Sequence, residues 1–225
     1  VALSHGHYDH TGGLRALLEK TECNGPILGH PFLDQERFVL QQGKPVRSIG
    51  LPVGTTLPRF SPVEYSTLLA NGLTFVSTIE RAPERFSATA HFFLDRFGEK
   101  PDPVHDDACL ALDTAEGPVV ILGCCHSGLA NTLNTLHNRL GYTTITGVIG
   151  GMHLNSAPAW ALEESLQTLE AFKVQWIAPG HCTGRETSIE LARRFSGRVL
   201  SYGVGAVFEF PALSQETLTS RGVRH

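Results

Sequence analysis

The stretch Ser4-His5-Gly6-His7-Tyr8-Asp9-His10-Thr11-Gly12-Gly13 concentrates histidine and aspartate in a few neighbouring positions. In extended backbone, residues i and i+2 point to the same side, so His5 and His7 can both face one metal ion. Gly6 leaves the space between their side chains clear. A solvated polar loop is the alternative explanation, but so dense a set of metal-ligand side chains favours a metal site.

Asp9 and His10 lie where this loop is expected to turn into a helix. Because the chain changes direction there, they can face a second cation close to the first. Leu14, Leu17 and Leu18 share one face of the helix that follows. We therefore predict a short buried strand over Val1-Ala2-Leu3, then a loop whose side chains bind two metal ions, and then a helix.

Composition limits the class of protein. The chain has 225 residues and 41% hydrophobic residues, which fits one domain with a substantial core. Its 18 basic and 22 acidic residues form no like-charge run, which argues against nucleic-acid or membrane-surface partners. With no apolar span or signal peptide visible, we expect a soluble, cytoplasmic protein.

The five cysteines do not predict a disulfide framework. Their number is odd, and adjacent cysteines rarely pair with each other, which favours a reducing compartment. They are Cys23, Cys109, Cys124, Cys125 and Cys182.

Strand and helix patterns alternate along most of the chain, which predicts an α/β fold and a single domain over residues 1–225. Prolines interrupt the region from about 41 to 103, and we interpret this region as a lid-like insertion. Its best strand candidates are Leu73–Ser77 and His91–Phe97. Elsewhere the expected strands are Pro26–Gly29, Ala108–Leu112, Val119–Leu122, Ile145–Ile149 and Val174–Ala178, with leucine-striped helices near 129–140 and 162–169.

Polar side chains follow several of these strands, and in α/β chains functional groups collect at strand ends. His126 follows one buried strand and His181 follows another, so we predict both as metal ligands. For each, the alternative is a core or helix-capping histidine.

Three further positions keep more than one role open. His153 could bind metal, contact substrate or hydrogen-bond a ligand. Either Asp106 or Asp107 could bridge two metals or cap a turn, and we choose Asp107 as the metal ligand. The role of His105 is open in the same way. Surface or core roles are expected for the remaining histidines, namely His30, His91, His137 and His225.

Two adjacent divalent ions suggest a mechanism. A water bound by both loses a proton near neutral pH, and the resulting hydroxide can attack a carbonyl or phosphoryl centre. Asp9 would bind the second ion and orient this hydroxide, and we predict Asp9 and His153 as catalytic residues. Mixed imidazole and carboxylate ligands suit zinc best, with iron and manganese as alternatives.

The opening motif resembles the HxHxDH signature of the metallo-β-lactamase superfamily. This resemblance implies a four-layer αβ/βα sandwich and a dinuclear metalloenzyme. Later segments resemble the branch that contains 7,8-dihydropterin-6-methyl-4-(β-D-ribofuranosyl)aminobenzene-5′-phosphate synthase. These segments are Asp106-Asp107-Ala108, Gly123–Asn131, Gly150–Leu154 and Gly180–Gly184.

The chain departs from the superfamily pattern in two ways. The strand region that normally precedes the HxHxDH loop is absent, so we expect a sandwich that lacks its N-terminal strands, with apolar surface near Val1–Leu3. The usual histidine of the third motif is absent unless His105 fills that position.

We predict a hydrolase that uses a metal-bound hydroxide on a small ester, lactone or phosphate ester. A transferase that condenses a pterin diphosphate with an aminobenzene ribose phosphate is the alternative that the branch implies. A set of basic residues in the insertion would allow an anionic substrate, although charges there are more often solvated; the set is Arg81, Arg85, Arg96 and Lys100. A non-catalytic metal-binding protein is the third hypothesis, and the intact HxHxDH motif argues against it.

Overall fold

The computed structural model describes residues 1–42, 44–211 and 213. Its largest element is a six-stranded sheet in the order β11-β10-β9-β8-β6-β5. The strands are β5 (Ser66–Ala70), β6 (Leu73–Val76), β8 (Cys109–Thr114), β9 (Gly117–Leu122), β10 (Gly147–Gly150) and β11 (Trp176–Pro179). β9, β10 and β11 run parallel, so their carboxyl ends lie at the same edge of the sheet.

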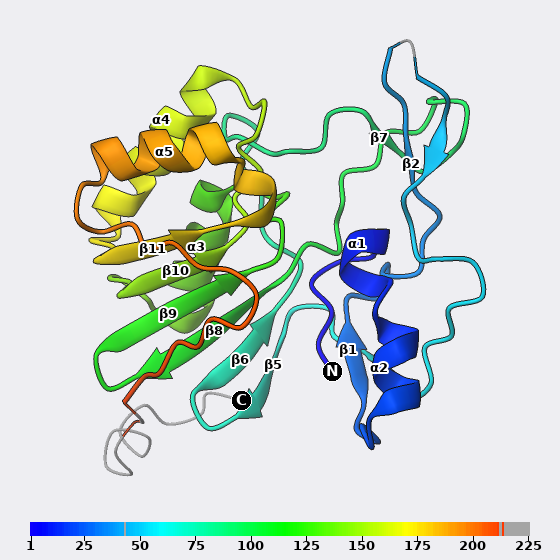
Figure 1. Ribbon diagram of the computed structural model, residues 1–225, viewed down its shortest axis with the longest axis horizontal. Coiled ribbons are helices and arrows are strands. Elements are labelled where there is room, and N and C mark those ends of the chain that lie inside the picture. The colour runs from blue at the N-terminus through cyan, green and yellow to red at the C-terminus, as the bar shows by residue number, and fades with distance from the viewer. Residues whose placement is uncertain (43, 212, 214–225) are drawn as a thin grey trace.

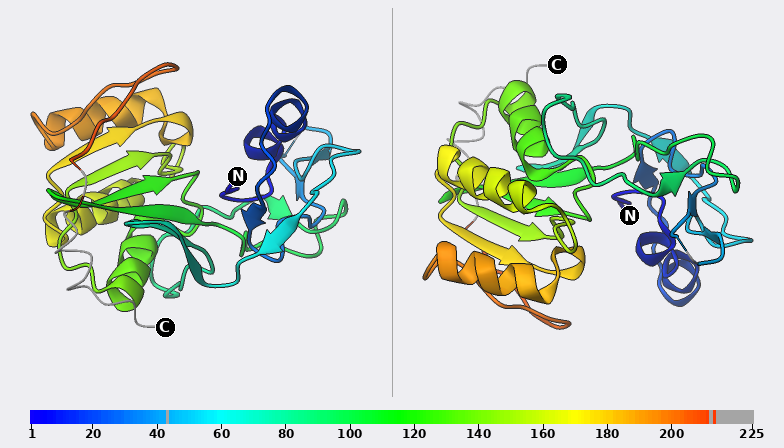
Figure 2. Two further views of the ribbon diagram at one scale, coloured as in Figure 1. Left: turned by 90° about the horizontal axis from the view of Figure 1, so that it is seen from below. Right: turned by 90° about the horizontal axis from the view of Figure 1, so that it is seen from above.

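Three helices accompany this sheet in one half of the molecule (Figures 1 and 2). They are α3 (Leu129–Leu140), α4 (Ala159–Ala171) and α5 (Arg185–Arg194). The predicted leucine stripe of α3 is confirmed: Leu129, Leu133 and Leu136 are buried in the main core, where they meet sheet residues such as Val120 and Val148. The predicted α/β alternation is therefore confirmed.

The N-terminal part forms the other half, with smaller elements (Figure 1). Its helices are α1 (Tyr8–Thr11) and α2 (Leu14–Lys20). It also contains two small sheets: β1 (Ile27–Gly29) pairs with β4 (Phe60–Pro62), and β2 (Phe38–Val39) pairs with β3 (Arg47–Ser48) and β7 (Phe92–Phe93). The short 3-10 helix η1 (His181–Thr183) belongs to the first half, where it follows β11.

The main sheet has a second apolar face, which is directed at the N-terminal half. Phe75 and Ala108 are buried there, and Ala2 and Leu28 pack against them. Cys109 and Ala111 face the helices instead, as the two-residue period of a strand requires. The sheet is thus covered on both faces, which is the arrangement of a sandwich.

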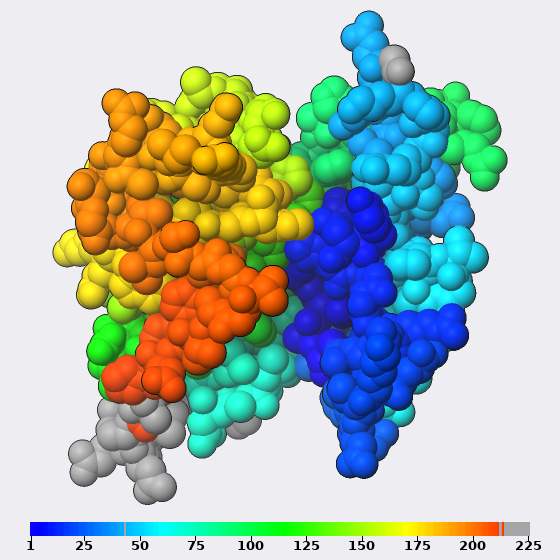
Figure 3. Space-filling model, in the orientation of Figure 1, coloured from blue at the N-terminus to red at the C-terminus, as the bar shows by residue number. Residues whose placement is uncertain are grey.

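The first residues lie at the junction of the two halves, as the dark blue atoms of the space-filling view show (Figure 3). Ala2 forms a parallel bridge with Leu28, and Leu3 is buried. A cavity of about 230 Å³ lies between this segment and the sheet, lined in part by Phe75 and Leu110. The expected apolar surface near Val1–Leu3 is therefore largely covered, with this cavity beside it.

The region predicted as an insertion, residues 41–103, contributes β5 and β6 to the main sheet. Within it, the predicted strand Leu73–Ser77 corresponds to β6 and the predicted strand His91–Phe97 shrinks to β7. The lid-like insertion therefore stays a prediction, and it can apply only to the segments outside β5 and β6, where regular structure is short. Among the described residues no helix is both long and apolar enough to cross a membrane.

Candidate metal centre

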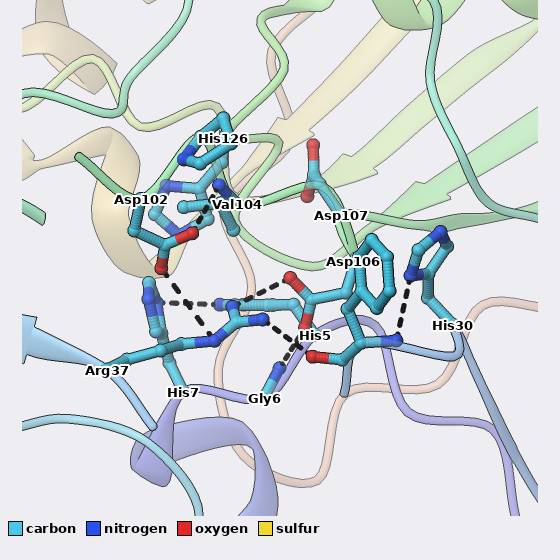
Figure 4. Close-up of polar contacts among 12 residues, drawn as sticks. His5, Gly6, His7, His30, Arg37, Asp102, Val104, Asp106, Asp107 and His126 are labelled. Carbon is cyan, nitrogen blue, oxygen red and sulfur yellow. Dashed lines mark hydrogen bonds and ion pairs between the residues drawn. The ribbon is translucent and has the colours of Figure 1, made fainter. Parts of the chain in front are cut away.

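Three buried histidines converge beneath the HxHxDH loop, and we call His5, His7 and His126 the inner triad. His5 Nε2 lies 3.1 Å from His7 Nδ1, and the His126 ring centroid lies 4.8 Å from each of the other two. One ligand nitrogen from each residue lies within 4.8 Å of the others. His5 and His7 leave the N-terminal segment just before α1, whereas His126 follows β9 (Figure 4).

The inner triad has the electronic state that a divalent cation requires. The Nδ1–H of His126 donates a 2.8 Å hydrogen bond to the Ala88 carbonyl, so Nε2 carries the lone pair. His126 Nε2 and His7 Nε2 are buried, with no hydrogen-bond partner among the described residues. Burial lowers the pKa of His5 and His126 well below the usual value and that of His7 to about 3. These imidazoles are therefore neutral near pH 7, and the residues fit a metal ion.

Asp9, His10 and His181 form a second group, which we call the outer triad. His10 Nε2 lies 3.1 Å from His181 Nε2, and Asp9 Oδ2 lies 3.6 Å from the first and 3.3 Å from the second. Their side chains are 40%, 18% and 46% exposed for Asp9, His10 and His181. The ring centroids of His5 and His10 are 4.2 Å apart, so the two triads are adjacent.

His153 and Phe92 border the inner triad. The His153 ring centroid lies 4.4 Å from that of His126, and His153 Nδ1 is buried with no described partner. Phe92, from β7, lies 5.1 Å from the His7 ring and 5.4 Å from the His126 ring. Phe92 thus places an aromatic ring against one side of the inner triad, a contact that the sequence did not predict.

Asp106 holds the loop that carries His5 and His7. Its Oδ2 accepts a 2.6 Å hydrogen bond from the Gly6 N–H, and its Oδ1 accepts a 2.7 Å hydrogen bond from Arg37 (Figure 4). Burial raises the pKa of Asp106 to about 6 although Arg37 and Gly6 favour the charged form. Asp106 is therefore mostly ionised near pH 7, and its carboxylate accepts hydrogen bonds from both the loop and Arg37.

Gly6 itself is required by packing. A Cβ at this position would lie 2.0 Å from the Leu33 carbonyl oxygen, which is well inside van der Waals contact. The buried Arg37 also donates to the Phe32 carbonyl and lies 3.7 Å from Asp102. Sequence reasoning missed Arg37, because a lone arginine carries no pattern that marks it as buried.

Asp107 belongs to neither triad. Its Oδ2 accepts a 2.7 Å hydrogen bond from the Ser127 N–H, next to His126, and its buried Oδ1 has no described partner. Its role as a ligand stays a prediction. His105 is exposed and joins no group of converging ligand atoms among the described residues.

Two cysteines that the sequence analysis did not choose lie at the site. Cys124 Sγ lies 3.1 Å from His10 Nε2, and one ligand atom from each of Cys124, His153 and Cys182 lies within 4.8 Å of the others. A hydrogen bond from the Cys124 thiol, with a further one from His153, lowers the pKa of Cys182 to about 4, and the same thiol contact with burial raises the pKa of Cys124. The signal was present, since each cysteine follows a strand and lies within two residues of a predicted ligand.

The other histidines lie elsewhere. His30 Nε2 is 2.9 Å from Thr78 Oγ1, His137 Nδ1 is 2.8 Å from the Tyr142 carbonyl, and His91 is exposed. Among the described residues none of these three joins a group of converging ligand atoms. His225 lies outside the described residues.

Comparisons with known proteins identify two relatives in one archaeon. The chain is 25% identical over 220 residues to 7,8-dihydropterin-6-methyl-4-(beta-D-ribofuranosyl)-aminobenzene-5'-phosphate synthase of Methanocaldococcus jannaschii, covering 93% of this chain and 74% of the relative. It is 29% identical over 200 residues to the uncharacterized protein MJ0448 of the same organism, covering 86% and 72%.

A solved structure also resembles the fold. The crystal structure of Tm1679, described as a metal-dependent hydrolase of the beta-lactamase superfamily, matches with a TM-score of 0.79 and 26% identity, over 94% of this chain and 79% of that one. The family model of the metallo-beta-lactamase superfamily matches residues 1–181. The resemblance seen in the sequence and the expected sandwich fold are thus confirmed, and the chain belongs to the metallo-beta-lactamase superfamily.

Proposed function

We propose that this protein is a metal-dependent hydrolase acting on a small ester, lactone or phosphate ester, with two divalent ions, most simply Zn²⁺, held by the inner and outer triads. The observation that carries the proposal is the adjacency of the two triads, with the His5 and His10 rings in contact. When bound, divalent ions in such a pair activate water and polarise a carbonyl or phosphoryl oxygen.

The protein's own groups divide the remaining work. The Asp9 carboxylate is partly exposed and faces His10 and His181, so it can orient an attacking water and accept its proton. His153 lies beside His126 with a buried unpartnered nitrogen, which places a hydrogen-bond donor or acceptor close to the reacting groups. Phe92 keeps bulk water away from the inner triad.

A transferase is the second candidate, because one relative is named as a synthase of a pterin-related phosphate. The basic set of the insertion gives it little support. Arg81 donates to the Pro103 and Val104 carbonyls and to Ser127, and Arg85 pairs with Glu164. These two guanidinium groups are occupied by the protein itself, so they add no support for the two anionic substrates of a transferase.

The test is a hydrolysis screen with zinc-loaded and chelator-treated protein on phosphodiester, lactone and thioester substrates. We expect zinc-dependent turnover of at least one class, lost in Asp9→Ala and retained in Asp34→Ala, an exposed aspartate outside the triads. No turnover on any class, together with diphosphate release only when a pterin diphosphate and an aminobenzene ribose phosphate are both present, would replace the hydrolase with the transferase.

A further inference from the structure

The loops that follow β9, β10 and β11 are tied together by backbone hydrogen bonds. The Gly151 N–H donates to the Gly123 carbonyl at 2.9 Å, and the Asn155 N–H donates to the Cys182 carbonyl at 3.2 Å. The three loops therefore form one rigid edge. The residues beside these tethers are placed by main-chain contacts and not by flexible side chains.

Cys124, His153 and Cys182 project from these loops, one from each. Their ligand atoms lie within 4.8 Å of one another, Cys124 is buried, and the other two are half-buried. Two thiols and one imidazole at such spacing match the sulfur and nitrogen ligand sets that hold Zn²⁺. We propose that these three residues form a thiolate-containing metal subsite, separate from the two triads, that takes a borderline or soft divalent ion such as Zn²⁺.

The backbone around these residues supports the proposal independently. A Cβ on Gly151 would lie 2.6 Å from Cys182 Sγ, so only glycine leaves room for that sulfur. His153 adopts a φ of +47°, a conformation that non-glycine residues rarely occupy. Such outliers gather at functional sites, where the surrounding structure holds them in place. The strain here orients His153, whose Nδ1 has no described partner.

The chemistry of the subsite differs from that of the triads. The triads offer imidazole and carboxylate groups, which discriminate poorly among divalent metals, whereas thiolates select softer ions. Cys124 Sγ also lies 3.1 Å from His10 Nε2, so the subsite borders the outer triad. The proposed subsite does not depend on the proposed hydrolase activity, because it concerns only which atoms bind metal.

Cobalt(II) loading tests the subsite directly. Thiolate ligands give cobalt an intense near-ultraviolet charge-transfer absorption that imidazole and carboxylate ligands do not give. We expect this absorption when the intact reduced protein is titrated with Co²⁺ after the weaker visible bands of the histidine-bound ion appear. Cys124→Ser and Cys182→Ser should each lose most of it, and the double variant should lose all of it.

Cys23→Ser is the matched control, because Cys23 is a free, half-buried cysteine outside the three loops. It should keep the full absorption. Retained visible bands in the Cys124 and Cys182 variants would show that they still fold and still bind cobalt through histidine. Visible bands without any thiolate absorption in the intact protein would overturn the subsite and leave the proposed hydrolase untouched, as would thiolate absorption that persists in the double variant.

Discussion

The inner and outer triads lie side by side yet differ in almost every physical property. The inner triad is buried, is built only of histidine, and has pKa values lowered by desolvation. The outer triad includes a carboxylate, and two of its three side chains are more than one-third exposed. In the function that we propose, burial suits the inner triad to hold an ion rigidly, whereas exposure leaves the outer triad on the side that a substrate can reach.

The difference also appears in how each triad is supported. The loop that carries His5 and His7 is fixed through Gly6 by Asp106, which is itself paired with Arg37. Asp9 and His181 contact each other and His10, but no buried charge pair holds them in the part of the chain that the structure describes. We infer that the inner triad depends on preorganised packing and that the outer triad would gain its order from the ion that we propose it binds.

The largest effect is expected when the inner triad is broken. His7→Ala should reduce metal content at both triads and bring turnover down to the level of the chelated protein, because the His5 and His10 rings are in contact. Elemental analysis and zinc-dependent hydrolysis measure this. His137→Ala, a change at an exposed histidine on α3, is the control and should behave as the unmodified protein. Full metal content in His7→Ala would contradict the claim that the inner triad is needed for metal binding at both triads.

Asp9→Ala should lower kcat by roughly 10²–10⁴-fold, because it removes the group that we propose orients and deprotonates water. The inner triad should still hold its ion, so metal content should fall by less than in His7→Ala. Elemental analysis and steady-state kinetics of the same preparation measure both quantities. Near-normal turnover in fully loaded Asp9→Ala would contradict the role given to the outer triad.

Removal of the buried charge pair should destabilise the fold. Arg37→Leu leaves Asp106 and Asp102 buried beside an apolar side chain, and breaking such a pair costs about 3–5 kcal/mol. Arg15→Leu, at an exposed pair with Glu19, should cost less than about 1 kcal/mol. Urea unfolding of both variants measures the free energies. Equal, small losses would show that Arg37 does not support the inner loop.

Stability of the metal-free protein should fall as pH falls from about 6.5 toward 3. Burial lowers the pKa of His7 from 6.5 to about 3, so between these values the unfolded chain binds a proton that the folded chain does not. His5 and His126 act in the same direction, whereas Asp106, with its pKa raised to about 6, acts in the opposite one between about 4 and 6.

Urea unfolding with chelator present, repeated across this pH range, measures the slope. His7→Gln should flatten it, and His137→Gln should leave it unchanged. A metal-free protein whose stability does not change with pH would mean that the inner histidines are not desolvated.

Much of the site could be predicted because its residues stand in short, distinctive patterns. The spacing of His5 and His7 predicted a shared direction, and the positions of His126 and His181 after buried strands predicted their approach to the loop. Both follow from the geometry of strands and of parallel sheets. The class of fold followed from the alternation of strand and helix patterns.

The rest depends on tertiary contacts that no local pattern encodes. Arg37 reads as an ordinary surface arginine, yet it is fully buried against two carboxylates. Phe92 lies in a proline-interrupted region whose periodicity is weak, so its position beside His7 could not be inferred. The contact of Asp106 with the Gly6 N–H, 100 residues away in the chain, likewise could not be inferred from the pair Asp106-Asp107.

Anomalous diffraction from zinc-loaded crystals tests the central claim most directly. We expect one zinc peak within ~2 Å of nitrogen atoms of His5, His7 and His126, and an adjacent one within the same distance of Asp9, His10 and His181, besides any peak at the proposed thiolate subsite. A fully loaded crystal without a peak at the inner triad would contradict the account.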